Sequence, residues 1–133
     1  MDRIIAIEDA VKNVREAGQI STLSIERKGL AHSIVYNIEN HGNYAVRNLF
    51  KYMDLIGLRL SVNDVAINNM EELGAFLRDK REKEKLTLRL MEGKTSLYNT
   101  QIIDIEKGRG YTKNTLLKYI NAFEDIDFKL CKC

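Results

Sequence analysis

The chain has 133 residues, of which 44% are hydrophobic and 30% are charged, and its formal net charge is +2. No apolar run approaches the roughly 18 residues that a membrane-spanning helix needs. The N-terminus begins with acidic Asp2 and lacks the apolar region of a secretion signal. These features predict a cytoplasmic protein of one or two small domains. The nearly balanced charge permits a nucleic-acid partner without requiring one.

One stretch of the chain occurs twice, 67 residues apart. Residues 38–54 (IENHGNYAVRNLFKYMD) and 105–121 (IEKGRGYTKNTLLKYIN) are identical at six of 17 positions, where chance would give about one. The similarity extends upstream to residues 15–26 and 81–92 and downstream to two alternating segments. We therefore expect one unit used twice, with unit one over residues 1–62, a hairpin or linker over 63–68, and unit two over 69–133.

The first unit is predicted to contain four helices and a strand. Ser21 is placed to cap a short second helix, and Gly29 to supply the tight turn after it. Alternation over residues 58–62 predicts a strand, and Asn63-Asp64 before residues 65–67 predicts a hairpin. The apolar stripes of helices one, three and four recur every three or four residues. They are Ile7, Ala10, Val11 and Val14; Leu30, Ile34 and Ile38; and Val46, Leu49, Phe50 and Met53.

The second unit repeats this order more clearly. Thr87 is expected to cap a short helix, Gly108 to end the next one, and Thr112 or Asn114 to cap the last. An alternating segment, residues 126–130, is predicted to pair with residues 58–62 in one small antiparallel sheet that joins the units. The expected fold is therefore mainly α. The helical stripes of this unit are Met70, Leu73 and Leu77; Leu97, Ile102 and Ile105; and Leu116, Leu117, Ile120 and Phe123.

A short capped helix, a tight turn and a second short helix form the helix-turn-helix pattern, whose second helix enters the major groove of DNA. Asn and Gln pair there with adenine, and Thr forms hydrogen bonds or contacts a thymine methyl group. The predicted base-reading residues are Tyr98, Asn99, Thr100, Gln101 and Asp104 in unit two and His32, Ser33, Tyr36 and Asn37 in unit one. The predicted phosphate contacts are Lys28, Arg47, Lys94, Lys107, Arg109 and Lys113, with the backbone amides at the helix starts Ser21 and Thr87.

With these elements the chain resembles the phage lambda-repressor and Cro-like (XRE-like) helix-turn-helix family. The resemblance covers about 60 residues of each unit. It rests on an Arg in helix one, a Leu-Thr start to helix two and an Ile-x-x-hydrophobic-Glu-x-Gly end to helix three. The matching residues are Arg81, Leu86-Thr87, Met91, Ile102, Ile105-Glu106, Gly108 and Thr115-Leu116-Leu117.

The resemblance implies a sequence-specific, repressor-like transcriptional regulator with two tandem copies of a DNA-binding unit. It also implies the ion pairs Arg81–Glu106 and Arg15–Glu39. The chain departs from the family at Glu26 and Glu92, where the family has Ala. It departs again early in helix two, where Thr22 and Leu88 replace a DNA-contacting Gln.

Two functional classes stay open. One is a regulator that reads double-stranded DNA with helix three of each unit. The other is an antitoxin-like module that uses the frame for assembly, as a homodimer or with a partner protein. The duplication favours one chain holding both halves of what is usually a dimer, and pairing between chains is the alternative.

No catalytic set stands out, so we expect no enzymatic activity, no cofactor and no small-molecule substrate. Cys131 and Cys133 form a lone C-x-C pair at the tail, and no further Cys completes a zinc site. His32 and His41 lie far from them in the sequence and are expected at the surface, so no metal site is predicted.

Overall fold

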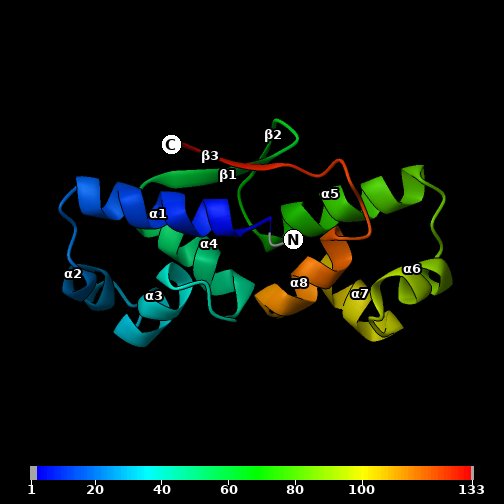
Figure 1. Ribbon diagram of the computed structural model, residues 1–133, viewed down its shortest axis with the longest axis horizontal. Helices are drawn as coiled ribbons and strands as arrows, with labels where there is room; N and C mark the ends of the chain where they lie inside the picture. The colour runs from blue at the N-terminus through cyan, green and yellow to red at the C-terminus, as the bar shows by residue number, and fades with distance from the viewer. Residues whose placement is uncertain (1–2, 133) are drawn as a thin grey trace.

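The computed structural model describes residues 3–132, in which eight helices accompany one three-stranded antiparallel sheet. Helices α1 to α4 form one half of the molecule and α5 to α8 the other, and the sheet lies along one side of both halves (Figure 1). The elements are α1 (Ile5–Ala17), α2 (Thr22–Arg27), α3 (His32–Glu39), α4 (Val46–Leu55), β1 (Leu58–Val62), β2 (Val65–Ile67), α5 (Met70–Lys83), α6 (Leu88–Thr95), α7 (Asn99–Glu106), α8 (Lys113–Ile120) and β3 (Phe128–Lys132). None of the described helices combines the length and apolar character that crossing a membrane requires.

Local sequence signals account for several helix ends. The Ser21 hydroxyl accepts a hydrogen bond from the Ser24 amide at 3.1 Å, and the Thr87 hydroxyl accepts one from the Leu90 amide at 3.2 Å, so both predicted N-caps are confirmed. Gly29 and Gly108 have φ of +103° and +72°, which a residue with a side chain rarely adopts. Asn69 caps α5 by accepting from the Glu72 amide at 2.8 Å, a cap that the sequence reading missed.

Two details of the helices differ from the sequence prediction. Leu30 and Leu97 precede α3 and α7 instead of lying within them, and both side chains are buried in the turn before the helix. The cap of α8 is not the side chain of Thr112 or Asn114. Instead, the Asn114 amide donates a hydrogen bond of 3.0 Å to Oδ1 of Asn43 in the other half. A contact between the halves therefore supplies this cap.

The sheet has the order β2-β1-β3 and is antiparallel throughout. Asn63 and Asp64 connect β1 to β2 with positive φ at both residues, as a two-residue type I′ turn requires. The predicted pairing of the two strands is confirmed, but β3 begins at Phe128 and not at residue 126. The reason lies in the turn, where the Asn63 side chain accepts the Asp127 amide at 2.8 Å and the Asn63 amide donates to the Asp127 carbonyl at 3.0 Å.

Several contacts between the two units are reciprocal: where one residue of unit one contacts a second position in unit two, the equivalents of these two residues contact each other as well. In the sheet, Leu60 faces Leu130 and Val62 faces Phe128. Between the loops, the Val46 amide donates to the Tyr111 carbonyl at 3.0 Å, and the Lys113 amide donates to the Tyr44 carbonyl at 2.9 Å. Reciprocal contacts of this kind occur around a twofold axis. An approximate twofold therefore runs near the Ser61–Lys129 pair of the sheet and the Ala45–Thr112 bridge.

The apolar residues of both halves form one continuous core. Its centre holds a small void of about 10 Å³, to which α1, α4, α5, α8, β1 and β3 all contribute side chains. The two halves are thus packed as one body, because neither completes this part of the core alone. The residues around the void are Ile4, Ile7, Val46, Leu49, Phe50, Leu60, Leu73, Leu116 and Phe128.

Candidate nucleic-acid interface

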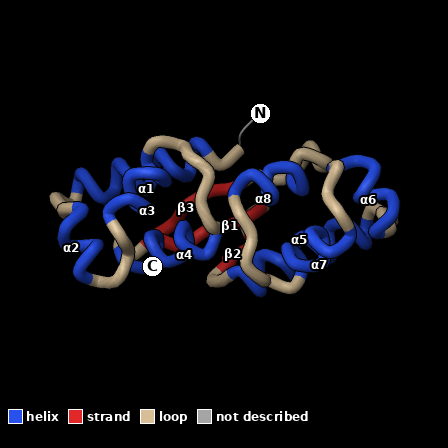
Figure 2. The backbone as a smooth tube through the Cα atoms, turned by 90° about the horizontal axis from the view of Figure 1, so that it is seen from below, coloured by secondary structure: helices blue, strands red, loops and turns tan. Residues whose placement is uncertain are grey.

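Two pairs of short helices, α2–α3 and α6–α7, lie on the side of the molecule away from the sheet (Figure 1). Figure 2 views that side directly and shows α3 and α7 on either side of the central helices α4 and α8. Within each pair the chain turns through a residue with positive φ, Gly29 in the first and Ser96 in the second. Ile25 and Met91 anchor α2 and α6 in the core. The outer faces of α3 and α7 are therefore presented together on one side.

In the second half, α7 offers an exposed polar start. Tyr98 is 74% exposed, and Asn99 and Thr100 are exposed with side chains that form no hydrogen bond within residues 3–132. Gln101 is half-buried, and its Oε1 accepts the Tyr98 amide at 2.9 Å. The oxygen needed for a bidentate contact with adenine is thus occupied in the helix cap, which the prediction of Gln101 as a base reader did not anticipate. Asp104 likewise accepts a hydrogen bond from Arg109 at 3.3 Å.

In the first half, α3 presents different side chains at the same places. His32 and Ser33 are exposed, and Tyr36 is 62% exposed. Asn37 was also predicted to read bases, but its side-chain amide donates to the Asn43 carbonyl, and its Oδ1 fills the space beside Gly42. Asn37 therefore holds the loop after α3 and is not a free reading group.

The predicted phosphate contacts fall into two groups. Five of the cations are exposed, namely Lys28, Arg47, Lys94, Lys107 and Arg109. The prediction for Lys113 is wrong, because its side chain is buried at the junction of the halves. Its Nζ donates to Glu8 Oε2 at 3.1 Å and to the His41 carbonyl at 3.0 Å. Ser21 and Thr87 use their hydroxyls as caps, and Thr22 is half-buried at the start of α2.

Lys113 belongs to a buried polar cluster centred on Glu8 of α1, which is 0% exposed. Glu8 Oε1 lies 2.8 Å from His41 Nδ1, and Glu8 Oε2 accepts from the Tyr44 hydroxyl and from Lys113. His41 also lies 3.1 Å from Asp9 Oδ1 through its Nε2. The cluster joins both halves, since Lys113 comes from α8. A carboxylate on the apolar face of α1 was its only sequence signal.

The cluster has no counterpart on the other side of the approximate twofold axis. Gly74 and Gly108 stand where the first half has Glu8 and His41. A Cβ on Gly74 would lie 2.5 Å from the Glu106 carbonyl oxygen, so α5 packs too closely on the end of α7 to admit a side chain. The Tyr111 hydroxyl, equivalent to that of Tyr44, is buried and has no hydrogen-bond partner among the described residues.

Replacing each tyrosine by phenylalanine tests this one-sided arrangement. Tyr44→Phe is expected to lower the free energy of unfolding by about 1–3 kcal/mol, because the buried Glu8 carboxylate loses a donor. Tyr111→Phe is expected to leave stability unchanged or to raise it by up to about 1 kcal/mol, because it removes a buried hydroxyl without a partner. Urea denaturation of both variants measures the difference, and equal losses would contradict it.

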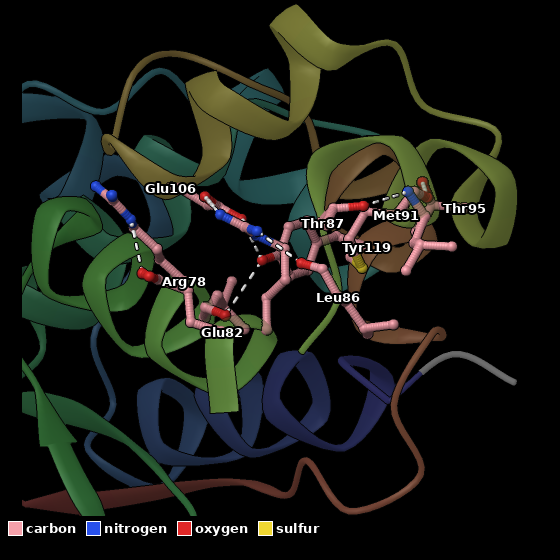
Figure 3. Close-up of polar contacts among 11 residues, drawn as sticks. Arg78, Glu82, Leu86, Thr87, Met91, Thr95, Glu106 and Tyr119 are labelled. Atoms are coloured by element: carbon pink, nitrogen blue, oxygen red, sulfur yellow. Dashed lines mark hydrogen bonds and ion pairs between the residues drawn. The ribbon is translucent and has the colours of Figure 1, made fainter. Parts of the chain in front are cut away.

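Each half also contains the predicted ion pair between its first and third helices, and Figure 3 shows the network around Glu106 in the second half. Arg81 Nε donates to Glu106 Oε2 at 2.7 Å and Nη2 donates to Oε1 at 3.0 Å. Two further bonds that were not predicted complete this network, from Arg81 to the Leu86 carbonyl at 2.7 Å and from the Tyr119 hydroxyl to Glu106 at 2.6 Å. The first half repeats every contact with Arg15, Glu39, Ile20 and Tyr52.

These networks fix α3 and α7 by their C-terminal ends. Glu39 and Glu106 are the last residues of the two helices, and each carboxylate is held by the first and fourth helix of its own half. Burial raises the pKa of Tyr52 and Tyr119, so both phenols stay protonated and donate. The orientation of each outward-facing helix is therefore set by a bidentate ion pair.

The first network predicts an acid-dependent loss of stability. Burial by itself would raise the pKa of Glu39, but the hydrogen bonds from Arg15 and Tyr52 outweigh it and hold the pKa below its usual value. The stability from this carboxylate is thus present above the unfolded pKa of about 4.3 and is lost as the pH falls through the lower folded pKa. We expect unfolding free energy to fall more steeply below about pH 4 for the wild type than for Glu39→Gln. Parallel curves would contradict this.

No cluster of three or more His, Cys, Asp or Glu in the described part of the chain is arranged to hold a metal ion. Cys131 is exposed on β3, and Cys133 lies outside the described residues. Comparison of the chain with protein-family models, curated proteins and solved structures finds no match.

Proposed function

We propose that this chain is a sequence-specific DNA-binding regulator in which α3 and α7 enter the major groove as the recognition helices of two tandem helix-turn-helix units. One observation carries the proposal. Both helices lie on the same side of the molecule, around one approximate twofold axis, and each begins with exposed polar side chains that form no hydrogen bond among the described residues. Regulators that read two half-sites need two helices in this relation.

The charge and the held orientation of the helices support the same function. The exposed cations Lys28, Arg47, Lys94, Lys107 and Arg109 lie in or beside the two helix pairs or between them, where phosphate contacts would position the chain on the duplex. The Arg–Glu networks fix each helix before any DNA is bound, which reduces the ordering cost of binding.

The second candidate is a protein-interaction module of the antitoxin type. It is favoured by Leu23 of α2 and Leu90 of α6, which are 53% and 52% exposed. Large apolar side chains on the outer surface of both helix pairs suit a protein partner. Sequence-specific binding to duplex DNA distinguishes the two candidates, because a module kept for assembly alone has no preference among DNA sequences.

The test begins with selection of binding sites from a random duplex pool. Asn99→Ala is expected to cost about 1–3 kcal/mol at the selected site and to relax the preference at one base pair. Asn99 is chosen because its amide is free, whereas that of Gln101 serves the helix cap. Asn13→Ala on α1, also exposed, is the matched control and should bind like the wild type. If Asn99→Ala binds the selected site equally well, α7 is not the reading helix.

Phosphate contacts have a separate signature. Lys107→Ala should weaken binding to all duplexes alike and should reduce the slope of log affinity against log salt by about one. Fluorescence anisotropy over a range of salt concentrations measures both quantities. An unchanged slope would show that Lys107 contacts no phosphate.

A further inference from the structure

The two outward-facing helices carry different chemistry in the same frame. Helix α3 begins with His32-Ser33 where α7 begins with Asn99-Thr100. In the next turn, Tyr36 of α3 is exposed, whereas Ile103, its equivalent on α7, is half-buried. All four side chains at the helix starts are free of hydrogen bonds within residues 3–132. Packing does not dictate the differences at the helix starts, because all four of these side chains are exposed.

The aromatic side chains occupy different places in the two halves. In the second half Tyr98 stands just before α7, and its equivalent in the first half is Ala31. In the first half the aromatic residue is Tyr36, in the second turn of α3. A tyrosine at the start of a recognition helix and one a turn later meet different base pairs of a half-site.

The starts of the two helices also select different bases. The Asn99 amide matches the donor and acceptor of adenine in the major groove, and Thr100 suits a thymine methyl group or a hydrogen bond. The neutral His32 ring carries one donor and one acceptor on opposite sides of a rigid ring, so it cannot reproduce the parallel pair of bonds that Asn makes. Equivalent positions in the two half-sites thus have different preferred bases.

The two helices cannot exchange places, because the halves are one body. The sheet, the Ala45–Thr112 bridge and the buried Glu8–Lys113 pair connect them, and that ion pair has no symmetric counterpart, since Gly74 and Val46 occupy the equivalent places. One chain therefore always presents one α3 and one α7 in fixed relation.

From these observations we propose that the DNA this chain recognises is a pair of unequal half-sites, bound in a single orientation. The proposal rests on the DNA-binding function proposed above and specifies its ligand. Half-site one is read by His32, Ser33 and Tyr36, and half-site two by Asn99 and Thr100 with Tyr98 beside them. The target is then a non-palindromic duplex, on which the chain has a direction.

The first experiment uses the whole chain and the duplex selected from a random pool. Two palindromes are built from it, one from each half-site, with the spacing kept. Each palindrome is expected to bind at least about tenfold more weakly than the selected site, since each places mismatched base pairs under one helix. Asn99→Ala should relax base preference in one half-site only, and His32→Ala in the other only.

A second variant gives the chain two alike helices. His32→Asn, Ser33→Thr and Tyr36→Ile together place the α7 residues on α3, at positions where the side chains make no hydrogen bonds in the described structure. This variant should unfold at the same urea concentration as the wild type. It is expected to prefer the palindrome of half-site two over the original site by about tenfold.

Each remaining outcome has a definite meaning. Wild-type selection of a palindrome, or equal binding to the built palindromes, overturns the unequal half-sites and leaves the DNA-binding function in place. Recovery of one half-site with random flanking sequence also overturns the proposal, because one of the two helices then reads no bases. If no duplex is enriched, or if all sequences bind alike, the proposed function itself fails.

Discussion

Replacing Glu106 by Ala is expected to lower the free energy of unfolding by about 3 kcal/mol, because it leaves the Arg81 guanidinium buried without its counter-ion. The side chains of the pair are only 10% and 5% exposed, so water cannot solvate the remaining charge. The Tyr119 hydroxyl would lose its carboxylate acceptor in the same step. Urea denaturation followed by circular dichroism measures the loss.

Helix α5, which carries Arg81, also supplies a matched control for this prediction. Arg78 and Glu82 of α5 form an ion pair of 2.9 Å with side chains 59% and 56% exposed, and Figure 3 shows both residues near the Glu106 network. Glu82→Ala is expected to cost no more than about 0.5 kcal/mol, because an exposed pair is solvated in either case. Similar losses for both variants would show that burial does not decide the effect.

A double change separates the ion pair from the packing around it. Arg81→Met with Glu106→Leu removes both charges and keeps apolar volume at each place, so it is expected to cost much less than the sum of the two single changes. Additive losses would argue that the two side chains do not interact in solution.

The local signals of the repeat made much of this fold predictable. The Ser21 and Thr87 caps, the positive φ at Gly29 and Gly108 and the Asn63-Asp64 hairpin all depend on residues within a few positions of each other. The Arg–Glu pairs were predictable for a different reason. They occur twice, with matching separations of 24 and 25 residues, at equivalent places of two units that resemble one family.

Apart from the pairing of β1 with β3, the contacts between the two halves could not be predicted in this way. Lys113 follows Thr112 at the start of a helix and looks like a surface cation, but its partner Glu8 lies 105 residues away. Asn43 caps α8 across 71 residues. Neither segment contains a signal for its partner. The repeat identifies residues at equivalent positions, whereas these contacts join residues at different positions of the two units. Gln101 had a local signal, since a Gln three residues into a helix often completes a capping box, but its N-cap is Tyr98 instead of Ser or Thr.

Two of the differences between the halves lie where the halves meet and where they face outward. The buried polar side chains at the junction, Glu8, His41 and Lys113, come from both halves but surround one carboxylate on one side of the axis. The frame around them repeats closely, down to the same four contacts of each Arg–Glu network. Under the proposed function one chain needs both copies, since neither copy carries the junction or both reading helices alone.

Phe128→Asp is expected to disrupt the junction from the sheet side. Phe128 is 9% exposed, pairs with Val62 and borders the central void beside Ile7 and Leu73. Burying a neutral polar group without a hydrogen bond costs about 2–7 kcal/mol by transfer estimates, and an unpaired carboxylate costs more. The least disruptive way to solvate it is to separate β3 from β1. We expect a loss of at least about 3 kcal/mol in unfolding free energy.

The matched control lies on the outer side of the same strand. Cys131→Asp introduces the same charge on β3 at an exposed position and is expected to change stability by no more than about 0.5 kcal/mol. Urea denaturation of the two variants separates the effect of burial from the effect of charge.

Phe128→Asp also tests whether one chain spans both half-sites. Under the proposed function, α3 and α7 contact half-sites about one helical turn apart, about 34 Å or 10 base pairs, and only the joined core and sheet hold them at that spacing. Phe128→Asp should therefore bind the two-half-site duplex no better than a single half-site, whereas Cys131→Asp binds like the wild type.

Light-scattering mass and footprint length complete the test. A monomer that protects two half-sites supports the single-chain arrangement, and a dimer that protects them shows that units pair between chains. A Phe128→Asp variant that keeps both its stability and its DNA affinity would rule out the fused dimer, because a buried carboxylate cannot leave an intact junction unaffected.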